Sequence, residues 1–364
     1  MLAAARTAKP SRILVADDST FMRRVLTQAL RDAGFEVVGE AADGDEALAL
    51  YRELRPDAMT LDLAMPGMDG IGVLRALRGE RSSLPVVVVS AFSPAHGARA
   101  VDALAEGAFD LVAKPAFGEP LEQFVSALRE KVTAAAGAAA GAATLAPAPA
   151  ARAPRPVAAG SAVARLRARR APAGSTKVVL IATSTGGPRA LAELIPALPS
   201  PLGAGGMIVQ HMPAGFTASL AQRLDRGSKL TVIEARGGEA LKPDTLILAP
   251  GGSHLRLGDD GVGERVRLTD EAAIGGLRPR ADLTIADAAR AFGERLLLVV
   301  MTGMGKDGLE GAREVRARGG RILAEAESTC TVYGMPRAIV EAQLADDVLP
   351  LGELAEAIAT ETGS

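Results

Sequence analysis

The chain has 364 residues, of which 48% are hydrophobic, 23% charged and 3% aromatic. This length suits two domains, and the shortage of aromatic rings disfavours a surface that stacks on nucleic-acid bases. The single cysteine, Cys330, excludes an internal disulfide and a multi-cysteine metal cluster. No apolar run approaches the length of a membrane span and the first residues lack the apolar core of a signal peptide, so we expect a cytoplasmic protein without membrane insertion.

The net charge of −2 is distributed unevenly along the chain. Residues 11–131 carry a net charge of −6, residues 132–176 carry +6 without an acidic side chain, and residues 177–364 carry −4. The middle segment is rich in Ala, Pro and Gly and has no large apolar pattern to bury. These features predict a first domain at 11–131, a flexible linker at 132–176 and a second domain at 177–360.

In the first domain, short β-branched runs alternate with amphipathic segments. The expected strands are 13–17, 36–41, 58–63, 86–91 and 110–115. The expected helices are 20–34, 44–54, 70–78, 95–107 and 121–132. Such alternation predicts a doubly wound α/β domain, in which helices cover both faces of a parallel sheet.

Polar side chains stand where these strands end. Ligands of open α/β sheets bind beyond the carboxyl ends of the strands, and this sequence places there Asp17, Asp18, Asp62, Ser90 and Lys114. Three carboxylates at one edge repel each other unless a hard cation such as Mg²⁺ joins them, while Lys114 and Ser90 could bind the oxygens of a phosphoryl group on Asp62. In the alternative, the acids only cap the following helices, but capping does not explain the Ser and the Lys-Pro at the other two strand ends.

The segments ILVADDST, LDLAMPGMDG, VVVSAFS and VAKPAF resemble the response-regulator receiver domain over residues 11–131. The resemblance implies a flavodoxin-like fold, a bound Mg²⁺ and phosphoryl transfer to Asp62. The implied metal ligands are Asp17, Asp18, Asp62 and the backbone carbonyl of Ala64, and the implied switch residues are Ser90 and Lys114. Ala64 stands where the family often has Glu, which bears on phosphate lifetime rather than on a backbone ligand.

The alternating pattern resumes after the linker. The expected strands are 177–183, 206–211, 230–235, 245–250, 296–302 and 321–327, with a hairpin formed by 254–258 and 265–269. The expected helices are 189–198, 216–225, 283–293, 309–319, 336–343 and 353–362. This pattern predicts a second, larger doubly wound α/β domain.

Three strand ends of the second domain carry a nucleophile, a base and an acid. Ser184 follows the strand at 177–183, His211 ends the strand at 206–211, and Asp307 follows the strand at 296–302. In Ser-His-Asp catalysis the imidazole takes the serine proton and the carboxylate orients the imidazole. The order Ser, His, Asp differs from that of the α/β-hydrolases, and Ala182 breaks their G-x-S-x-G elbow, so that fold is rejected.

Another serine also neighbours a histidine, in Gly251-Gly252-Ser253-His254. Ser253 lies in a predicted turn between antiparallel strands, where no helix N-terminus can support an oxyanion. We therefore prefer Ser184 as the nucleophile and treat His254 as an ordinary histidine.

A dinucleotide-binding fingerprint is a further alternative. Gly303, Gly305 and Gly308 match G-x-G-x-x-G between a strand and a helix, and Glu325 or Glu327 follows at the spacing of a ribose-binding acid. The match comes late in the domain, whereas this fingerprint normally opens one. The glycines instead suit a tight turn that brings backbone N–H groups near a developing oxyanion.

The segments ATSTGG, QHMPAGFTASLAQRL, LAPGGSHL, TGMGKDG and CTVYGMP resemble the CheB family, the protein-glutamate methylesterases of bacterial chemotaxis. With the receiver and the linker, the resemblance covers nearly the whole chain. It implies catalytic Ser184, His211 and Asp307, with Thr185 and the Met304 backbone near the oxyanion and no cofactor in the esterase site. The implied substrates are glutamyl methyl esters on the signalling helices of methyl-accepting chemotaxis receptors, often with receptor glutamines that are deamidated.

The resemblance also implies regulation: the unphosphorylated receiver covers the active site, and phosphorylation of Asp62 by a CheA-type histidine kinase relieves this. Lys306 replaces the family's Asn and Arg280 replaces a small residue, and with Arg278 we expect them to tune docking on an acidic receptor helix. A non-catalytic, phosphorylation-switched adaptor is the rival hypothesis. A DNA-binding regulator is disfavoured because the second domain is net acidic and shows no helix-turn-helix, so we expect no nucleic-acid partner.

Overall fold

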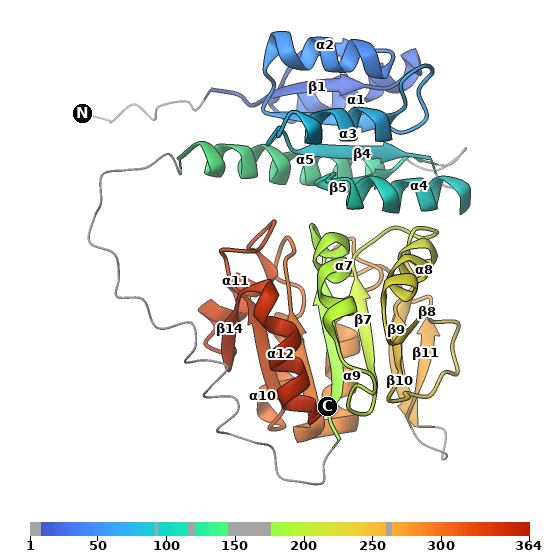
Figure 1. Cartoon of the computed structure of the whole chain (residues 1–364), viewed down its shortest axis with the longest axis vertical. Coiled ribbons are helices and arrows are strands. Elements are labelled where there is room, and N and C mark those ends of the chain that lie inside the picture. Colours follow the sequence, from blue (N-terminus) through green and yellow to red (C-terminus); the bar gives the residue numbers. More distant parts are fainter. Residues whose placement is uncertain (1–8, 92–93, 116–120, 145–175, 260–263) are drawn as a thin grey trace, which may run out of the picture. The chain divides into compact units, whose positions relative to one another are not determined.

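The computed structural model describes residues 9–91, 94–115, 121–144, 176–259 and 264–364. The described residues form two compact units: those of 9–91 and 102–144 belong to the first, and those of 94–101 and 176–364 belong to the second. Each unit is described by itself, and Figure 1 labels the elements.

The first unit is a five-stranded parallel sheet with helices on both faces (Figure 1). Its strands are β1 (Arg12–Ala16), β2 (Glu36–Ala41), β3 (Ala58–Asp62), β4 (Val86–Ser90) and β5 (Asp110–Ala113). The helices of this part of the chain are α1 (Thr20–Asp32), α2 (Gly44–Leu54), α3 (Gly70–Gly79), α4 (Pro94–Ala105) and α5 (Leu121–Thr144), and α4 contains residues of both units. The strand order β2-β1-β3-β4-β5 is that of flavodoxin-like sheets and confirms the predicted fold.

Local sequence explains where three of these helices begin. Ser19, Asp43 and Asp69 precede α1, α2 and α3, and each side chain accepts a hydrogen bond from a backbone N–H in the first turn. Asp17 and Asp62 do not serve as these caps, so the alternative in which the strand-end acids only cap helices is wrong for them.

The predicted linker boundary differs from the structure. Helix α5 continues through the Ala-rich residues to Thr144, beyond the expected end of the domain at 131. Alanine has the highest helix propensity, so a helix already started by the amphipathic residues before 132 can propagate through this run. The rest of the predicted linker, 145–175, lies outside the described residues.

The second unit contains a seven-stranded parallel sheet and a separate antiparallel hairpin. Its strands are β6 (Val178–Thr183), β7 (Gly206–Gln210), β8 (Thr231–Glu234), β9 (Thr245–Leu248), β10 (His254–Asp259), β11 (Glu264–Thr269), β12 (Leu296–Val300), β13 (Arg321–Glu325) and β14 (Asp347–Leu349). Its helices are α7 (Gly187–Ala197), α8 (Thr217–Gly227), α9 (Ala281–Phe292), α10 (Leu309–Ala317), α11 (Met335–Glu341) and α12 (Leu351–Thr362), with a 3-10 turn at Gly293–Arg295.

The strand order of the large sheet is β14-β13-β12-β6-β7-β9-β8, so the chain leaves β6 in one direction and later returns to its other side as β12. Such a reversal is where open α/β sheets bind ligands. Helices α7, α8 and α12 cover one face and α9 and α10 the other (Figure 1). The predicted doubly wound architecture is confirmed, and β10 pairs with β11 as the expected hairpin.

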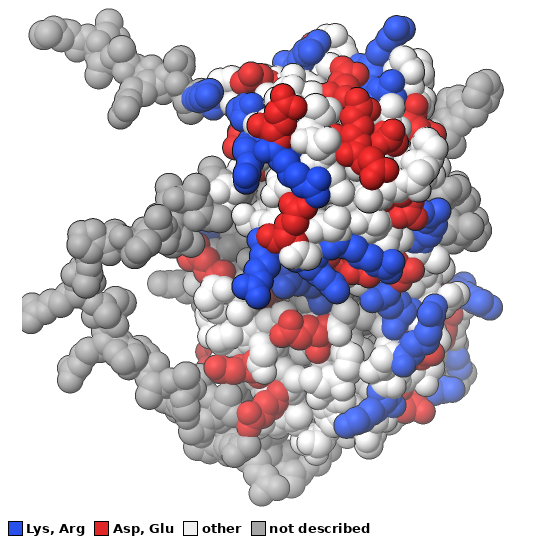
Figure 2. Space-filling model, turned by 45° about the horizontal axis from the view of Figure 1, so that its top comes forward, with Lys and Arg blue, Asp and Glu red and all other residues white. Residues whose placement is uncertain are grey.

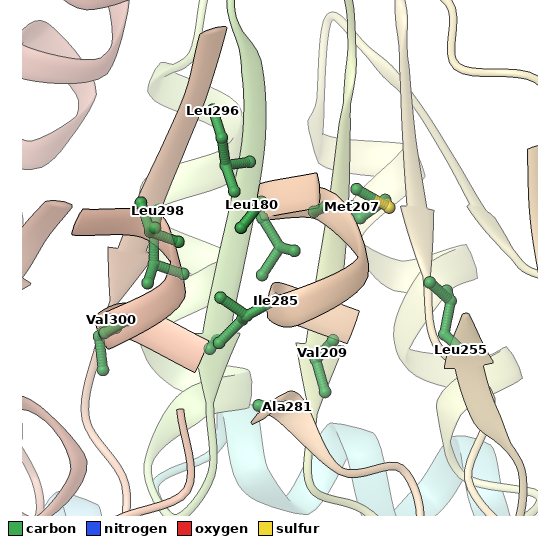
Figure 3. Close-up of a cluster of buried hydrophobic side chains, with 14 of the residues drawn as sticks. Leu180, Met207, Val209, Leu255, Ala281, Ile285, Leu296, Leu298 and Val300 are labelled. Atoms are coloured by element: carbon green, nitrogen blue, oxygen red, sulfur yellow. The ribbon is translucent and has the colours of Figure 1, made fainter. Parts of the chain in front are cut away.

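Helix α9 is fixed to the sheet by a buried aliphatic cluster. Figure 3 shows Ile285 of α9 among Leu180, Val209 and Leu298 of the three central strands, and all four are fully buried. Ala281 lies one turn earlier, near the carboxyl ends of these strands. Burial of aliphatic surface therefore places the N-terminus of α9 at the edge where the predicted catalytic residues stand.

Among the described residues, no helix is both long enough and apolar enough to span a bilayer.

Candidate active site and receiver site

Ser184 lies in the tight turn between β6 and α7. Its amide donates to the carbonyl of Thr302 at 3.0 Å, and its own carbonyl accepts from Gly187 at 2.8 Å. Gly186 has φ +80°, and a Cβ there would collide with the side chain of Thr331. The turn therefore requires glycine, and it presents the nearly buried serine beside the N-terminus of a helix.

His211 stands at the end of the neighbouring strand, β7. Its amide donates to the carbonyl of Thr183 at 3.1 Å, which continues the β6–β7 pairing by one residue. Gln210 is buried, and its side-chain amide donates to the carbonyls of both Ser184 and His211 at 2.9 Å. Gln210 thus ties the two strand ends together, a role that the sequence analysis missed although this residue directly precedes the predicted base.

Asp307 is joined directly to His211. The imidazole Nε2 lies 2.7 Å from Asp307 Oδ2, and the side chains are 7% and 2% exposed. The same oxygen accepts from the amide of Ala281 at 2.7 Å, while Oδ1 accepts from Asp282 at 3.0 Å and from Gly308 at 2.9 Å. The start of α9 therefore supplies two of the amides that fix this carboxylate.

These contacts keep Asp307 ionised. Burial by itself would raise the pKa of Asp307, but the hydrogen bond and charge of His211 and the amides of Ala281 and Asp282 outweigh burial and hold that pKa well below its ordinary value. An ionised carboxylate only accepts hydrogen bonds, so Nε2 of His211 must carry the proton in this pair. The nitrogen left to take a proton from a hydroxyl is Nδ1.

The structure brings the three predicted catalytic residues to adjacent strand ends but does not join all of their side chains. Among the described residues, no hydrogen bond links the Ser184 hydroxyl to His211. Catalytic hydrogen bonds are often long or misaligned before substrate binds and tighten in the complex. The geometry thus fits a triad whose acid and base are already paired.

Thr185 directly follows Ser184, and Met304 directly follows Gly303, which lies against Ser184. Thr185 is buried, and its carbonyl accepts from the hydroxyl of Thr302 at 2.9 Å. Met304 follows Gly303, where a Cβ would lie 2.8 Å from the Ser184 Cβ and 2.5 Å from the Met335 sulfur. The absence of a side chain at Gly303 therefore permits the close approach of the Gly303 backbone to the serine turn.

Thr302 and Glu325 form a buried network that the sequence analysis did not assign. Glu325 is fully buried; its carboxylate accepts from the Thr302 amide at 2.8 Å and from the Thr329 hydroxyl at 3.0 Å. The Thr302 carbonyl in turn accepts from the Ser184 amide. Glu325 thus fixes the Thr302 backbone, which in turn binds the Ser184 amide. Because its carboxylate is used in these contacts, a ribose-binding role for Glu325 is disfavoured.

The alternative nucleophiles are placed elsewhere. The Ser253 hydroxyl donates to Asp270 at 3.1 Å, and Ser253 precedes the hairpin rather than a helix. His254 is fully buried and its Nδ1 accepts from a backbone amide. Burial raises the pKa of the half-buried Cys330 thiol, so that group stays protonated and is a poor nucleophile.

The first unit gathers its predicted acids at one edge of the sheet. Oxygens of Asp17, Asp18 and Asp62 all lie within 4.8 Å of one another, with Asp17 and Asp62 buried and Asp18 exposed. Lys114 Nζ lies 2.8 Å from Asp17 Oδ2 and 2.7 Å from Asp62 Oδ2. Ser90 is buried with no hydrogen-bond partner for its hydroxyl among the described residues. All five predicted side chains therefore converge at one edge.

The donor set fits a hard divalent cation. It combines three carboxylates with the nearby backbone of Ala64, whose amide donates to Asp62 Oδ1 at 3.3 Å. Burial raises the pKa of Asp17 despite the hydrogen bond and the charge of Lys114, and repulsion from the Asp62 carboxylate adds to this rise. A second positive charge would relieve that repulsion, as expected of the Mg²⁺ site of a receiver domain.

Comparisons with known proteins agree with both units. Residues 179–358 match the family model for the CheB methylesterase, and residues 13–127 match that for the response regulator receiver domain. A Symbiobacterium thermophilum protein named protein-glutamate methylesterase/protein-glutamine glutaminase is 43% identical, over 98% of this chain and 99% of its own. A Myxococcus xanthus protein of that name, numbered 5, is 44% identical over 94% and 95%. The crystal structure of the Thermotoga maritima CheB methylesterase catalytic domain is 44% identical, with a TM-score of 0.49, over 51% of this chain and 98% of that one.

Fold and site together define a response regulator in which a receiver domain precedes an α/β domain of the methylesterase type. The chain belongs to the CheB methylesterase family.

Proposed function

We propose that this protein is a serine esterase that hydrolyses glutamate methyl esters on the signalling helices of chemoreceptors. The observation that carries the proposal is the buried His211–Asp307 pair at the strand end next to the Ser184 turn. With Nε2 committed to Asp307, Nδ1 of His211 is free to accept the serine proton. The same groups would also deamidate receptor glutamines.

The reaction follows from these positions. The Ser184 oxygen attacks the ester carbonyl while His211 takes its proton, and backbone N–H groups near Thr185 and Met304 stabilise the oxyanion. The methoxide leaves as methanol with the proton from His211, and the acyl group stays on the serine. Water, deprotonated by His211, then releases a glutamate side chain and restores the serine. With a glutamine substrate the leaving group is ammonia.

Methanol release from methylated receptor tests the proposal. Ser184→Ala should lower the rate by at least about 10³-fold, as expected when the nucleophile of such a triad is lost. Ser253→Ala is the matched control, because Ser253 bonds to Asp270 outside the site, and it should keep the wild-type rate. Wild-type turnover in Ser184→Ala, or no turnover in the wild type, would refute the assignment. An inactive wild type that is not labelled by a serine-directed reagent would favour a non-catalytic adaptor.

We further propose that phosphorylation of Asp62 activates the esterase, with a CheA-type histidine kinase as the phosphodonor and a cytoplasmic site of action. Asp17, Asp18, Asp62 and the Ala64 carbonyl would hold Mg²⁺, which neutralises the developing charge on the transferred phosphoryl group. Lys114 and Ser90 stand beside Asp62, where they can bind the phosphoryl oxygens and report its arrival.

The activation is tested with the intact protein and a small acyl-phosphate donor. The donor plus Mg²⁺ should raise the rate of methanol release in the wild type and leave Asp62→Asn at its basal rate. Equal rates in the wild type with and without the donor, once phosphorylation has been verified by mass spectrometry, would refute the activation.

The net charge of the two domains favours protein partners over DNA, since residues 11–131 carry −6 and residues 177–364 carry −4. On the face shown in Figure 2, acidic side chains accompany the basic ones. A nucleic-acid site needs concentrated positive charge, so binding should be absent even at low salt.

A further inference from the structure

Arg280 is the residue directly before α9, and its guanidinium group contacts the site. Its Nε lies 3.1 Å from Asp307 Oδ1, one terminal nitrogen lies 2.8 Å from Asp282 Oδ2, and the other donates to the carbonyl of Ile274 at 3.1 Å. All three guanidinium nitrogens therefore have partners within this unit. The sequence analysis did not foresee these contacts of Arg280 within its own unit.

The backbone of Arg280 is fixed as well. Its amide donates to Nδ1 of His254 at 3.1 Å, and His254 is fully buried with Nε2 3.4 Å from the carbonyl of Ala272. Helix α9, which starts at the next residue, is held by its packing on the sheet. The side chain thus projects from a rigid point and holds Asp307 in one orientation.

We propose that Arg280 is a positioning residue that fixes Asp307 and disfavours the protonated form of His211, so that the enzyme keeps its base free at lower pH. The inference rests on the proposed esterase function for its kinetic consequence but not for its effect on His211.

The argument is electrostatic. Asp307 stabilises a proton on His211, and a cation shared by the same carboxylate reduces that stabilisation and also repels the imidazolium directly. Because Asp307 and His211 are nearly buried, water and salt screen this effect weakly. The neutral imidazole of His211 is the form that accepts the serine proton. The Arg280 guanidinium therefore extends activity to lower pH.

Two further charged side chains of the described residues stand close to Asp307 in the chain or share its ion pair. Asp282 shares Arg280 with Asp307, and the exposed Lys306 directly precedes Asp307 in the chain. Among the described residues, Arg280 is the one Lys or Arg side chain within ion-pair distance of Asp307. The nearby Arg278 is exposed and donates to the carbonyl of Glu271, which makes it a matched control.

The direct test is an NMR titration of the histidine ring signals in the full-length protein. The His211 signal is assigned by its loss in His211→Gln. Arg280→Met should raise the pH midpoint of His211 by about 0.5 to 1 pH unit, because the imidazolium loses its repulsive neighbour. Arg280→Lys, which keeps the charge without the fork, should show less than half of that shift, and Arg278→Met should leave the midpoint unchanged.

The kinetic test uses the pH dependence of kcat/KM for methanol release. Its acid limb should move to higher pH in Arg280→Met and much less in Arg280→Lys, whereas a purely structural defect would lower the rate equally at all pH values. An unchanged or lower His211 midpoint in a folded Arg280→Met protein overturns the inference. If the wild type releases no methanol, the proposed function fails, and the NMR titration still decides the role of Arg280.

Discussion

Asp307 contacts His211 through Nε2 of the imidazole, at 2.7 Å, and not through Nδ1. The carboxylate is ionised and accepts only, so this contact fixes the tautomer with the proton on Nε2. The proposed base is therefore Nδ1. Nε2 thus binds the carboxylate and Nδ1 accepts the proton, and the identity of residue 307 decides which nitrogen can serve as the base.

Asp307→Asn should disable the base. An asparagine amide can donate to Nε2 and favour the tautomer with the proton on Nδ1, which cannot accept from Ser184. We expect kcat for methanol release to fall by about 10³- to 10⁴-fold, as in other triads that lose this carboxylate. Circular dichroism should show an intact fold, and a folded variant within about tenfold of wild-type kcat would contradict the assigned role.

The same substitution should change how stability depends on pH. The pKa of Asp307 is lowered in the folded state, so its ionised form stabilises the fold above the unfolded-state pKa of about 3.9. That contribution is lost as the pH falls toward the folded-state pKa. The free energy of unfolding of the wild type should therefore approach that of Asp307→Asn on acidification, as measured by urea denaturation.

Gly303→Ala should reduce turnover without unfolding the protein. The added Cβ would lie 2.8 Å from the Ser184 Cβ and 3.0 Å from the Ser184 amide, so the serine turn must shift. Displacement of a catalytic group by about 1 Å can cost roughly 10²-fold in rate, and we expect a loss of that order in kcat. Gly352→Ala in α12 is the control, since its Cβ would meet open space, and it should retain full activity.

Lys114→Met should destabilise the receiver unit in the absence of divalent cations. Lys114 neutralises two buried carboxylates, Asp17 and Asp62, and its removal leaves them facing each other without a cationic partner. Loss of one partner from a buried ion pair costs about 3 kcal/mol or more. Added Mg²⁺ should recover part of this loss, and a wild-type unfolding midpoint in cation-free buffer would contradict the prediction.

Glu325→Gln should become increasingly stabilising as the pH rises. Burial raises the pKa of Glu325 in the folded state. The protonated side chain therefore stabilises the fold of the wild type below the unfolded-state pKa of about 4.3. This contribution to the free energy of unfolding is lost as the pH rises through the folded-state pKa. Glutamine can still accept from the Thr302 amide, and the Thr329 hydroxyl can reverse its role. We expect the difference in the free energy of unfolding between Glu325→Gln and the wild type to be larger at pH 7 than at pH 4. A difference in the free energy of unfolding that stays constant with pH would contradict this prediction.

The sequence predicted that the candidate site residues lie at one edge of each sheet, because they stand at strand ends. Parallel strands deliver their carboxyl ends to one edge, so the residues after β6, β7 and β12 had to meet once the sheet formed. The same reasoning placed Asp17, Asp62 and Lys114 together in the receiver unit. The end of the first domain was less predictable, because the Ala-rich run to Thr144 can serve as helix or linker with little difference in local preference.

The sequence by itself determined the two-domain α/β architecture, the strand-end chemistry and the family, since periodicity and local motifs encode them. Tertiary structure alone decided which imidazole nitrogen faces Asp307, that Arg280 contacts this carboxylate, and that Glu325 supports the Thr302 backbone. These contacts join residues far apart in the chain whose side-chain directions depend on how α9 and β13 pack against β12. Burial then gives each contact its strength, and no local pattern in the sequence reports burial of a charged group.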